Sequence, residues 1–233
     1  MSEAIRESCN YFFYEVGRLT GIETIDRYAA AFGLGQSTGI ELGERTGVLA
    51  GPEYSQSQGQ IWYDGSTLQA AIGQSDNLAS PLQLANYIAT LVGGGDRYPA
   101  HLLKSVKSYD NTALEVLYDE EPLNTVEMSE STLEAVKKGM GELVRTGSVS
   151  SYFQDCIVSA GAKTGSAQTG GEVANGVFVC FAPFEDPEIA VAVVIEKGGS
   201  GSALASSAVG ILNAWFGGRD ALSGVVSENT LLP

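Results

Sequence analysis

The sequence predicts an α+β fold in which an antiparallel sheet is flanked by helices. A segment of small residues at 161–168 is followed by two runs rich in Val, Ile and Phe, at 177–181 and 189–195. Such runs are typical of strands, and the Pro and Asp residues between the last two indicate a hairpin. Apolar residues at helical spacing predict helices before these strands, and residues 203–216 predict a last helix packed on the sheet.

Length and charge limit the class of protein. The chain has 233 residues, of which 44% are hydrophobic, and a formal net charge of −15. The length suits one large domain or two small ones, and we expect a single domain over 1–233 with a weakly structured tail at 217–233. The negative charge argues against nucleic acid or an anionic membrane surface as a partner. We find no apolar run of membrane-spanning length and no signal peptide.

The N-terminal third is predicted to be helical at first and irregular afterwards. Apolar residues at helical spacing predict one helix over residues 4–19 and another over about 23–32, which Gly33 ends. Residues 36–79 are rich in Gly, Ser and Gln and show little periodicity. We therefore expect a long irregular region there, and long loops in compact domains are often functional.

A strong helix start follows at Ser80-Pro81-Leu82-Gln83. Serine can cap a helix, proline suits its first turn, and Gln83 can complete a capping box. We expect this helix to end at the glycines 93–95.

Next, two runs at 102–109 and 113–118 predict a hairpin. A second capping box, from Ser131 to Glu134, predicts a helix that ends at Gly147.

The segment around Lys163 has the residue types of a ligand-binding strand. Alternate residues of a strand share a face, so Thr164 and Ser166 are expected on one face and Lys163 on the other. Small residues such as Gly165 let a ligand approach the backbone closely. The alternative interpretation is a glycine-rich edge strand with a solvated lysine.

The cysteines and the single histidine do not indicate a site. Cys9, Cys156 and Cys180 are odd in number and lack metal-ligand spacing, so we expect them to pack as small apolar residues. A Ser-His-Asp triad would depend entirely on His101, and no Gly-x-Ser-x-Gly sequence is present. We interpret His101 as structural and expect neither a metal nor a cofactor.

Several short motifs occur in a defined order along the chain. They are Ser8-Cys9-Asn10, Gly33-Leu34-Gly35 with Thr38-Gly39-Ile40, Ala71-Ile72-Gly73-Gln74, Ser80-Pro81-Leu82-Gln83-Leu84-Ala85, Lys163-Thr164-Gly165-Ser166-Ala167-Gln168, Phe181-Ala182-Pro183 and Val193-Val194-Ile195-Glu196. From about residue 5 to 216 the series resembles the transpeptidase domain of class B, high-molecular-weight penicillin-binding proteins. The resemblance implies a serine β-lactamase/D,D-peptidase-like fold.

One element of that family is not found. Its nucleophilic serine lies in a Ser-x-x-Lys motif upstream of Ser-x-Asn, which here already stands at residue 8. No lysine of this chain has a serine three residues before it. The resemblance therefore implies the C-terminal part of the domain, with the first strands, the nucleophile helix and a membrane anchor on an upstream segment. We expect this chain alone to be inactive, and the anchored protein to lie on the extracytoplasmic face of the bacterial membrane.

The resemblance assigns catalytic roles to three residues. In this family a serine attacks the carbonyl of a D-Ala-D-Ala peptide or a β-lactam and forms an acyl-enzyme. Ser8 would relay a proton to the leaving nitrogen, Asn10 would hydrogen-bond the substrate backbone, and Lys163 would supply positive charge. The side chains of Ser8 and Lys163 are then expected within about 3 Å or one water of each other. The alternative for Ser8 is a helix-capping serine.

Substrate-binding roles fall on Thr164, Gly165 and Ser166. The two hydroxyls would bind the substrate carboxylate, on either side of the glycine. The backbone N–H of Ser166 would be one of two oxyanion-hole donors, and such a donor can lower the barrier by roughly 3 kcal/mol.

Three functions stay open at this level. The first is a peptidoglycan D,D-transpeptidase that cross-links cell-wall peptides. The second is a related hydrolase, a D,D-carboxypeptidase or β-lactamase, and the third is a non-catalytic binding module. The implied partners are the D-Ala-D-Ala stem peptide, β-lactams and the N-terminal part of the same domain, and the cell-division or elongation machinery remains open as a further partner.

Overall fold

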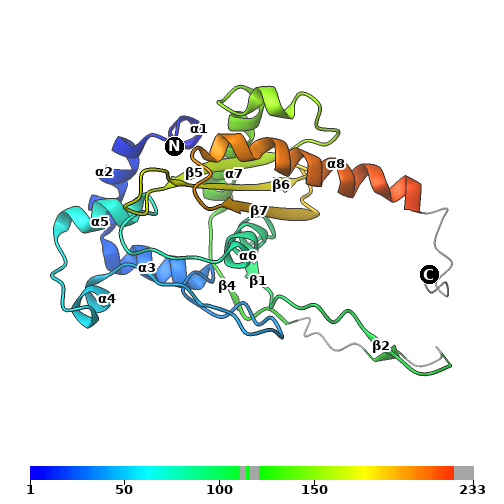
Figure 1. Cartoon of the computed structure of the whole chain (residues 1–233), viewed down its shortest axis with the longest axis horizontal. Helices are drawn as coiled ribbons and strands as arrows, with labels where there is room; N and C mark the ends of the chain where they lie inside the picture. Colours follow the sequence, from blue (N-terminus) through cyan, green and yellow to red (C-terminus); the bar gives the residue numbers. More distant parts are fainter. Residues whose placement is uncertain (111–113, 116–120, 223–233) are drawn as a thin grey trace. The chain divides into compact units, whose positions relative to one another are not determined.

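A computed structural model describes residues 1–110, 114–115 and 121–222 and confirms the α+β class (Figure 1). The elements, with η for a 3-10 helix, are α1 (Ser2–Arg6), α2 (Asn10–Thr20), α3 (Ile22–Ala31), α4 (Pro52–Ser57), α5 (Asp64–Ala71), α6 (Pro81–Val92), β1 (Asp96–Arg97), β2 (Val106–Lys107), β3 (Leu114–Glu115), β4 (Asn124–Thr125), α7 (Glu130–Arg145), η1 (Ser150–Phe153), β5 (Gly161–Ala167), β6 (Asn175–Ala182), β7 (Ile189–Ile195), η2 (Gly201–Leu204) and α8 (Ala205–Leu222). Among the described helices none is long and apolar enough to cross a membrane.

The chain divides into two compact units. The first contains residue 1 and residues 8–136, and the second contains residues 2–7 and 137–233. The expectation of a single domain stays a prediction.

The prediction of one N-terminal helix over residues 4–19 is wrong. Helix α1 ends at Arg6 and α2 begins at Asn10. Between them Ser8 has φ 51°, in the left-handed region, where a right-handed helix cannot continue. Apolar spacing alone cannot reveal such a break.

The predicted irregular region at 36–79 contains two helices, α4 and α5. Helix α5 packs against α2 at Gly17, where an added Cβ would overlap with the side chain of Ala71. Pro52 at the start of α4 was a usable signal, because proline is favoured in the first helical turn. Both helices are short and polar, so they lack the periodicity on which the prediction relied.

Helix α6 confirms the predicted capping box. Ser80 Oγ accepts a hydrogen bond from the Gln83 N–H, and Gln83 Oε1 accepts one from the Ser80 N–H. Gln83 is only 1% exposed, and its Nε2 donates to the carbonyls of Gln36 at 2.8 Å and Thr46 at 2.7 Å. A third carbonyl, that of Gly33, lies at 3.4 Å. One amide therefore holds the loop after α3 against the start of α6.

Two short antiparallel ladders complete this unit. Strands β2 and β3 pair Val106 with Glu115, which confirms the predicted hairpin for the paired residues; residues 113 and 116–118 lie outside the described part. Strands β1 and β4 also pair, and the sequence did not predict them. Their buried Arg97 donates to Asn124 Oδ1 and to the Ser37 carbonyl, and desolvation lowers its pKa. A pairing so distant in sequence has no local signal.

In the second unit, the predicted strand and hairpin are confirmed as an antiparallel sheet of order β5-β6-β7. Helix α8 runs along this sheet (Figure 1). Phe178 and Cys180 of β6 and Ala208 and Leu212 of α8 are fully buried in one core cluster. Alternate β6 residues thus form the apolar face on which α8 packs.

Two helix boundaries differ from their predictions. Helix α7 begins at Glu130, and Ser129 Oγ accepts from the Thr132 N–H, so the capping serine is Ser129 rather than Ser131. The last helix begins at Ala205 and continues to Leu222, past the predicted end at 216. The rest of the predicted tail, 223–233, lies outside the described residues.

A carboxyl group in the first unit is expected to make stability depend on pH. Asp26 of α3 lies against Gly51, and burial, with a smaller contribution from Glu53, raises its pKa to about 6. Between the unfolded pKa of about 3.9 and this value the folded chain binds more protons, so stability falls as pH rises through that window. We expect Asp26→Asn to raise Tm by about 2–4 °C at pH 7.5, allowing for partial exposure.

At pH 4 the same substitution should leave Tm nearly unchanged, because the wild-type carboxyl is then mostly protonated in the folded chain. Glu53→Gln is the matched control and should give a smaller rise at pH 7.5, since Glu53 is the second cause of the shift. An equal effect of Asp26→Asn at both pH values, measured by thermal unfolding, would contradict this account.

Candidate active site

Strand β5 positions four of the predicted site residues. It is an edge strand of the β5-β6-β7 sheet and pairs Lys163 with Val179 and Gly165 with Val177. Ser166 Oγ accepts a hydrogen bond from the Gly201 N–H at 3.3 Å, so this hydroxyl faces η2. By strand alternation Thr164 shares that face and Lys163 lies on the opposite one, as the sequence predicted.

Lys163 differs from a solvated surface lysine. Its side chain is half-buried, and Nζ donates to the carbonyl of Thr164 at 2.8 Å. Desolvation lowers the pKa of this amine from the usual lysine value. A partly desolvated cation on an edge strand is an arrangement found at binding and catalytic sites, where a charge acts on a ligand with less screening by water.

The backbone of β5 is in close contact with the segment after β7. A Cβ at position 201 would overlap with the carbonyl oxygens of Gly165 and Val177, so only glycine fits there. The Ser200 hydroxyl accepts from the Ser202 N–H at 3.3 Å and caps η2. This contact was not predicted, although the glycine-rich sequence at 198–201 was a signal of close backbone approach.

Ser8 lies on the connection between α1 and α2, Asn10 is the first residue of α2, and both residues are exposed. Cys9 holds the N-cap position of α2 and makes no side-chain cap bond, so Ser8 is not the residue that caps this helix. The left-handed backbone of Ser8 costs about 1–3 kcal/mol in a non-glycine residue, and such strain is concentrated at functional sites.

The predicted residues fall into two groups. Ser8 and Asn10 belong to the unit of residues 8–136, and Lys163, Thr164 and Ser166 belong to the unit of residues 137–233. The structure brings the members of each group together. The expected approach of Ser8 to Lys163 stays a prediction.

His101 and the three cysteines were not assigned to a site from the sequence. His101 is exposed, and its Nδ1 lies 3.1 Å from the Leu103 carbonyl. Cys180 is fully buried, and burial is the main cause that raises its pKa to about 12, so its thiol stays protonated at neutral pH. Cys9 and Cys156 are half-buried.

Comparison with known proteins identifies the family of this chain. The profile of the family described as "Penicillin binding protein transpeptidase domain" matches residues 1–214. Peptidoglycan D,D-transpeptidase MrdA of Escherichia coli K12 is 30% identical over an alignment of 223 positions, which covers 88% of this chain and 35% of that protein. The chain thus spans about a third of the length of the curated relatives it matches.

Solved structures of similar fold agree with the sequence relatives. Pseudomonas aeruginosa PBP2 in complex with WCK 5153 matches with a TM-score of 0.81 and 29% identity, over 92% of this chain and 48% of that one. The complex between PBP2 and MreC from Helicobacter pylori matches with a TM-score of 0.78 and 27% identity, over 92% and 39%. Residues 1–214 therefore have both the sequence pattern and the fold of this group.

Proposed function

This chain belongs to the penicillin-binding protein transpeptidase family, and we propose that it forms the C-terminal part of a peptidoglycan D,D-transpeptidase domain whose nucleophile lies on an upstream segment. The observation that supports this most is the half-buried Lys163, with its lowered pKa, in a Lys-Thr-Gly-Ser sequence on an edge strand. The relatives that bear a transpeptidase name are about three times as long as this chain.

In the proposed reaction this chain supplies the electrostatic half of the site. A serine hydroxyl of the upstream segment attacks the carbonyl of the stem peptide, and an oxyanion develops on the carbonyl oxygen. The Ser166 N–H donates to that oxyanion, and the Lys163 ammonium stabilises negative charge on substrate and nucleophile. The Thr164 and Ser166 hydroxyls bind the substrate carboxylate, while Ser8 passes a proton to the leaving nitrogen and Asn10 orients the peptide backbone.

The contact of Ser166 with η2 supports this assignment of roles. The Ser166 hydroxyl oxygen accepts a hydrogen bond from the Gly201 N–H at 3.3 Å. The same contact fixes the strand against η2 and so fixes the direction of the Ser166 N–H. Preorganised donors of this kind need no reorganisation at the moment of reaction.

The two alternative functions make different demands. A carboxypeptidase or β-lactamase needs a general base for deacylation, and no glutamate is placed for that role by a motif of this sequence. A purely binding module needs no nucleophile, which fits the chain taken alone because no Ser-x-x-Lys sequence occurs in it. The transpeptidase names of the relatives favour the first function.

The proposal extends to place and partners. We place the whole protein on the extracytoplasmic face of the membrane, held by an anchor on the upstream segment, with the D-Ala-D-Ala stem peptide as substrate and β-lactams as acylating inhibitors. One similar structure is a complex of PBP2 with MreC and another belongs to a peptidoglycan synthase complex, which supports a partner within a cell-wall assembly.

Labelling with a fluorescent penicillin tests the proposed function. This chain alone should form no covalent adduct, whereas a form carrying the upstream segment, fused or added as a separate chain, should be labelled. The added segment should also raise Tm, because β7 has an entirely apolar sequence and pairs only with β6 among the described strands. A stable adduct on the chain alone would refute the proposal, and release of D-alanine without cross-linking by the longer form would favour a carboxypeptidase.

A further inference from the structure

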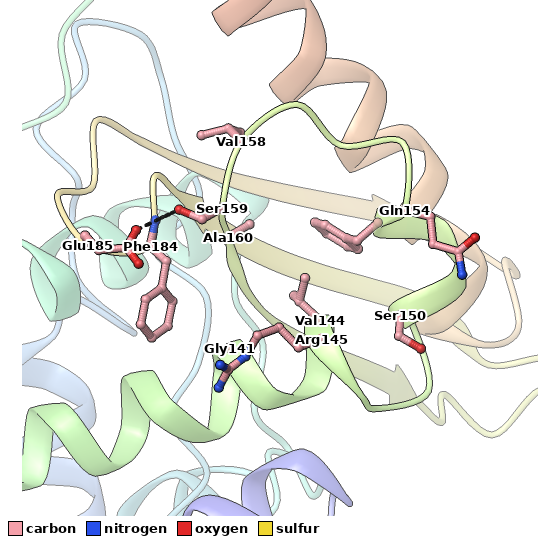
Figure 2. Close-up of a pocket in the computed structure, with 11 residues that line it drawn as sticks. Gly141, Val144, Arg145, Ser150, Gln154, Val158, Ser159, Ala160, Phe184 and Glu185 are labelled. Atoms are coloured by element: carbon pink, nitrogen blue, oxygen red, sulfur yellow. Dashed lines mark hydrogen bonds between the residues drawn. The ribbon is translucent and has the colours of Figure 1, made fainter.

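A pocket of about 370 Å³ opens on the unit of residues 137–233, and none of the predicted site residues lines it. Its walls come from the end of α7, from η1, from the segment before β5 and from the turn between β6 and β7 (Figure 2). The side chains that matter for binding are Val144, Arg145, Phe153, Val158, Phe184 and Glu185. The volume lies in the range of small-molecule sites, roughly 300–1,000 Å³.

The walls of the pocket are mainly apolar. Val144 of α7 and Phe153 of η1 are buried, and Val158 is half-buried against the same core. The ring of Phe184 stacks on Phe181 with centroids 5.9 Å apart, which fixes its position at one side of the pocket. A pre-formed apolar wall of this kind binds an aromatic or branched aliphatic group.

Two opposite charges border these walls. Arg145 is exposed, and within the described residues its guanidinium makes no hydrogen bond or ion pair. The Glu185 carboxylate accepts from Ser159 Oγ at 2.8 Å, and this bond is the main cause that lowers its pKa. Lys137, whose Nζ lies 5.6 Å from the centroid of the Phe184 ring, lowers that pKa further, and Arg145 does so to a smaller extent. Neither cation is in ion-pair contact with Glu185. Figure 2 shows the Phe184 side chain between Arg145 and Glu185.

We propose that this pocket binds an α-amino acid with a large apolar side chain, either free or as the last residue of a peptide. The carboxylate of the ligand pairs with Arg145, whose planar guanidinium can form two parallel hydrogen bonds to it. The amino or amide N–H of the ligand donates to Glu185, and the apolar side chain lies against Phe184 and Phe153.

Charge complementarity selects this ligand over simpler ones. An apolar cation would be repelled by the positive charge of Arg145. An apolar anion without an N–H would be repelled by the carboxylate of Glu185. A ligand that carries both a carboxylate and an N–H offers a partner of the right kind to each side chain. The inference does not depend on the transpeptidase activity, because the pocket shares no residue with the proposed site.

Binding is tested by calorimetric and ligand-observed NMR titration of this chain with L-phenylalanine, N-acetyl-L-phenylalanine and L-phenylalaninamide. A ligand of this size is expected to bind with Kd of about 0.1–1 mM. Phenylalaninamide, which lacks the carboxylate, should bind at least tenfold more weakly. Tighter binding of phenylalanine than of its N-acetyl form identifies a free amino acid as the ligand, and the reverse identifies a peptide end.

Arg145→Gln should weaken binding of the better ligand at least tenfold, whereas Arg18→Gln, which removes an exposed arginine paired with Glu15, should leave it unchanged. Equal Tm values of the variants and the wild type establish that the fold is kept. If neither L-phenylalanine nor N-acetyl-L-phenylalanine binds at 10 mM, the proposal is overturned. Binding that is equal for phenylalaninamide, or equal after Arg145→Gln, overturns it as well.

Discussion

Replacing Lys163 with alanine, in a form of the protein that carries the upstream segment, is expected to slow acylation by penicillin about 10²- to 10⁴-fold. In the proposed site the half-buried ammonium would act on the β-lactam carboxylate and on Ser8 with less screening than a surface charge, so its loss would raise the barrier to acylation. The measurement is the second-order rate constant of acylation, followed with a fluorescent penicillin.

Two further variants separate charge from packing. Lys163→Met keeps most of the side-chain volume and should be nearly as slow as Lys163→Ala, whereas Lys138→Ala removes an exposed lysine of α7 and should react at the wild-type rate. Because burial lowers the pKa of Lys163, the wild-type rate should decline on the alkaline side below about pH 10.4, the usual lysine value. Unchanged acylation in Lys163→Ala would make Lys163 a structural residue of the strand edge.

Replacing Gln83 with leucine is expected to lower the free energy of unfolding by about 3 kcal/mol or more. Leucine has a volume similar to that of glutamine, and the site is only 1% exposed. The substitution nevertheless removes the N–H donors to the carbonyls of Gln36 and Thr46. Each buried carbonyl left without a donor costs about 1–3 kcal/mol. Urea or guanidinium unfolding of this chain measures the loss.

The capping box provides the control for this prediction. Ser80→Ala removes only the side-chain cap of α6 and should cost about 1 kcal/mol. Gln83→Glu keeps the shape of the side chain but offers an acceptor where donors are needed, so it should cost as much as Gln83→Leu. If either Gln83 variant is no less stable than Ser80→Ala, the amide does not hold the loop in the way described.

Local signals in the sequence were sufficient for much of the fold. Ser80 and Gln83 predicted the start of α6 because both halves of a capping box lie within three residues. The apolar runs of β6 and β7 predicted a hairpin because the strands are adjacent along the chain. The failures occurred where distant residues decide the structure, as in the pairing of Asp96 with Thr125, or where one backbone angle breaks a regular pattern, as at Ser8.

The same distinction between local signals and long-range contacts applies to the candidate site. The sequence predicted the alternation of Lys163 and Ser166 on β5, because two-residue periodicity is a property of any strand. It could not predict the half-burial of Lys163, which depends on packing around the strand, or the second function of Gln83, whose acceptors lie 37 to 50 residues away. Contacts of this kind are formed by the tertiary structure and leave no pattern in a single sequence.

The close contact of Gly201 with β5 limits the substitutions that these two distant segments can accept. The loop after β7 can exchange exposed residues freely, but a side chain at 201 is accepted only if η2 withdraws from β5. That withdrawal would also break the hydrogen bond from the Gly201 N–H to Ser166 Oγ. Substitution of Gly201 is therefore expected to disturb this edge of the sheet more than substitution of its neighbours Ser200 and Ser202.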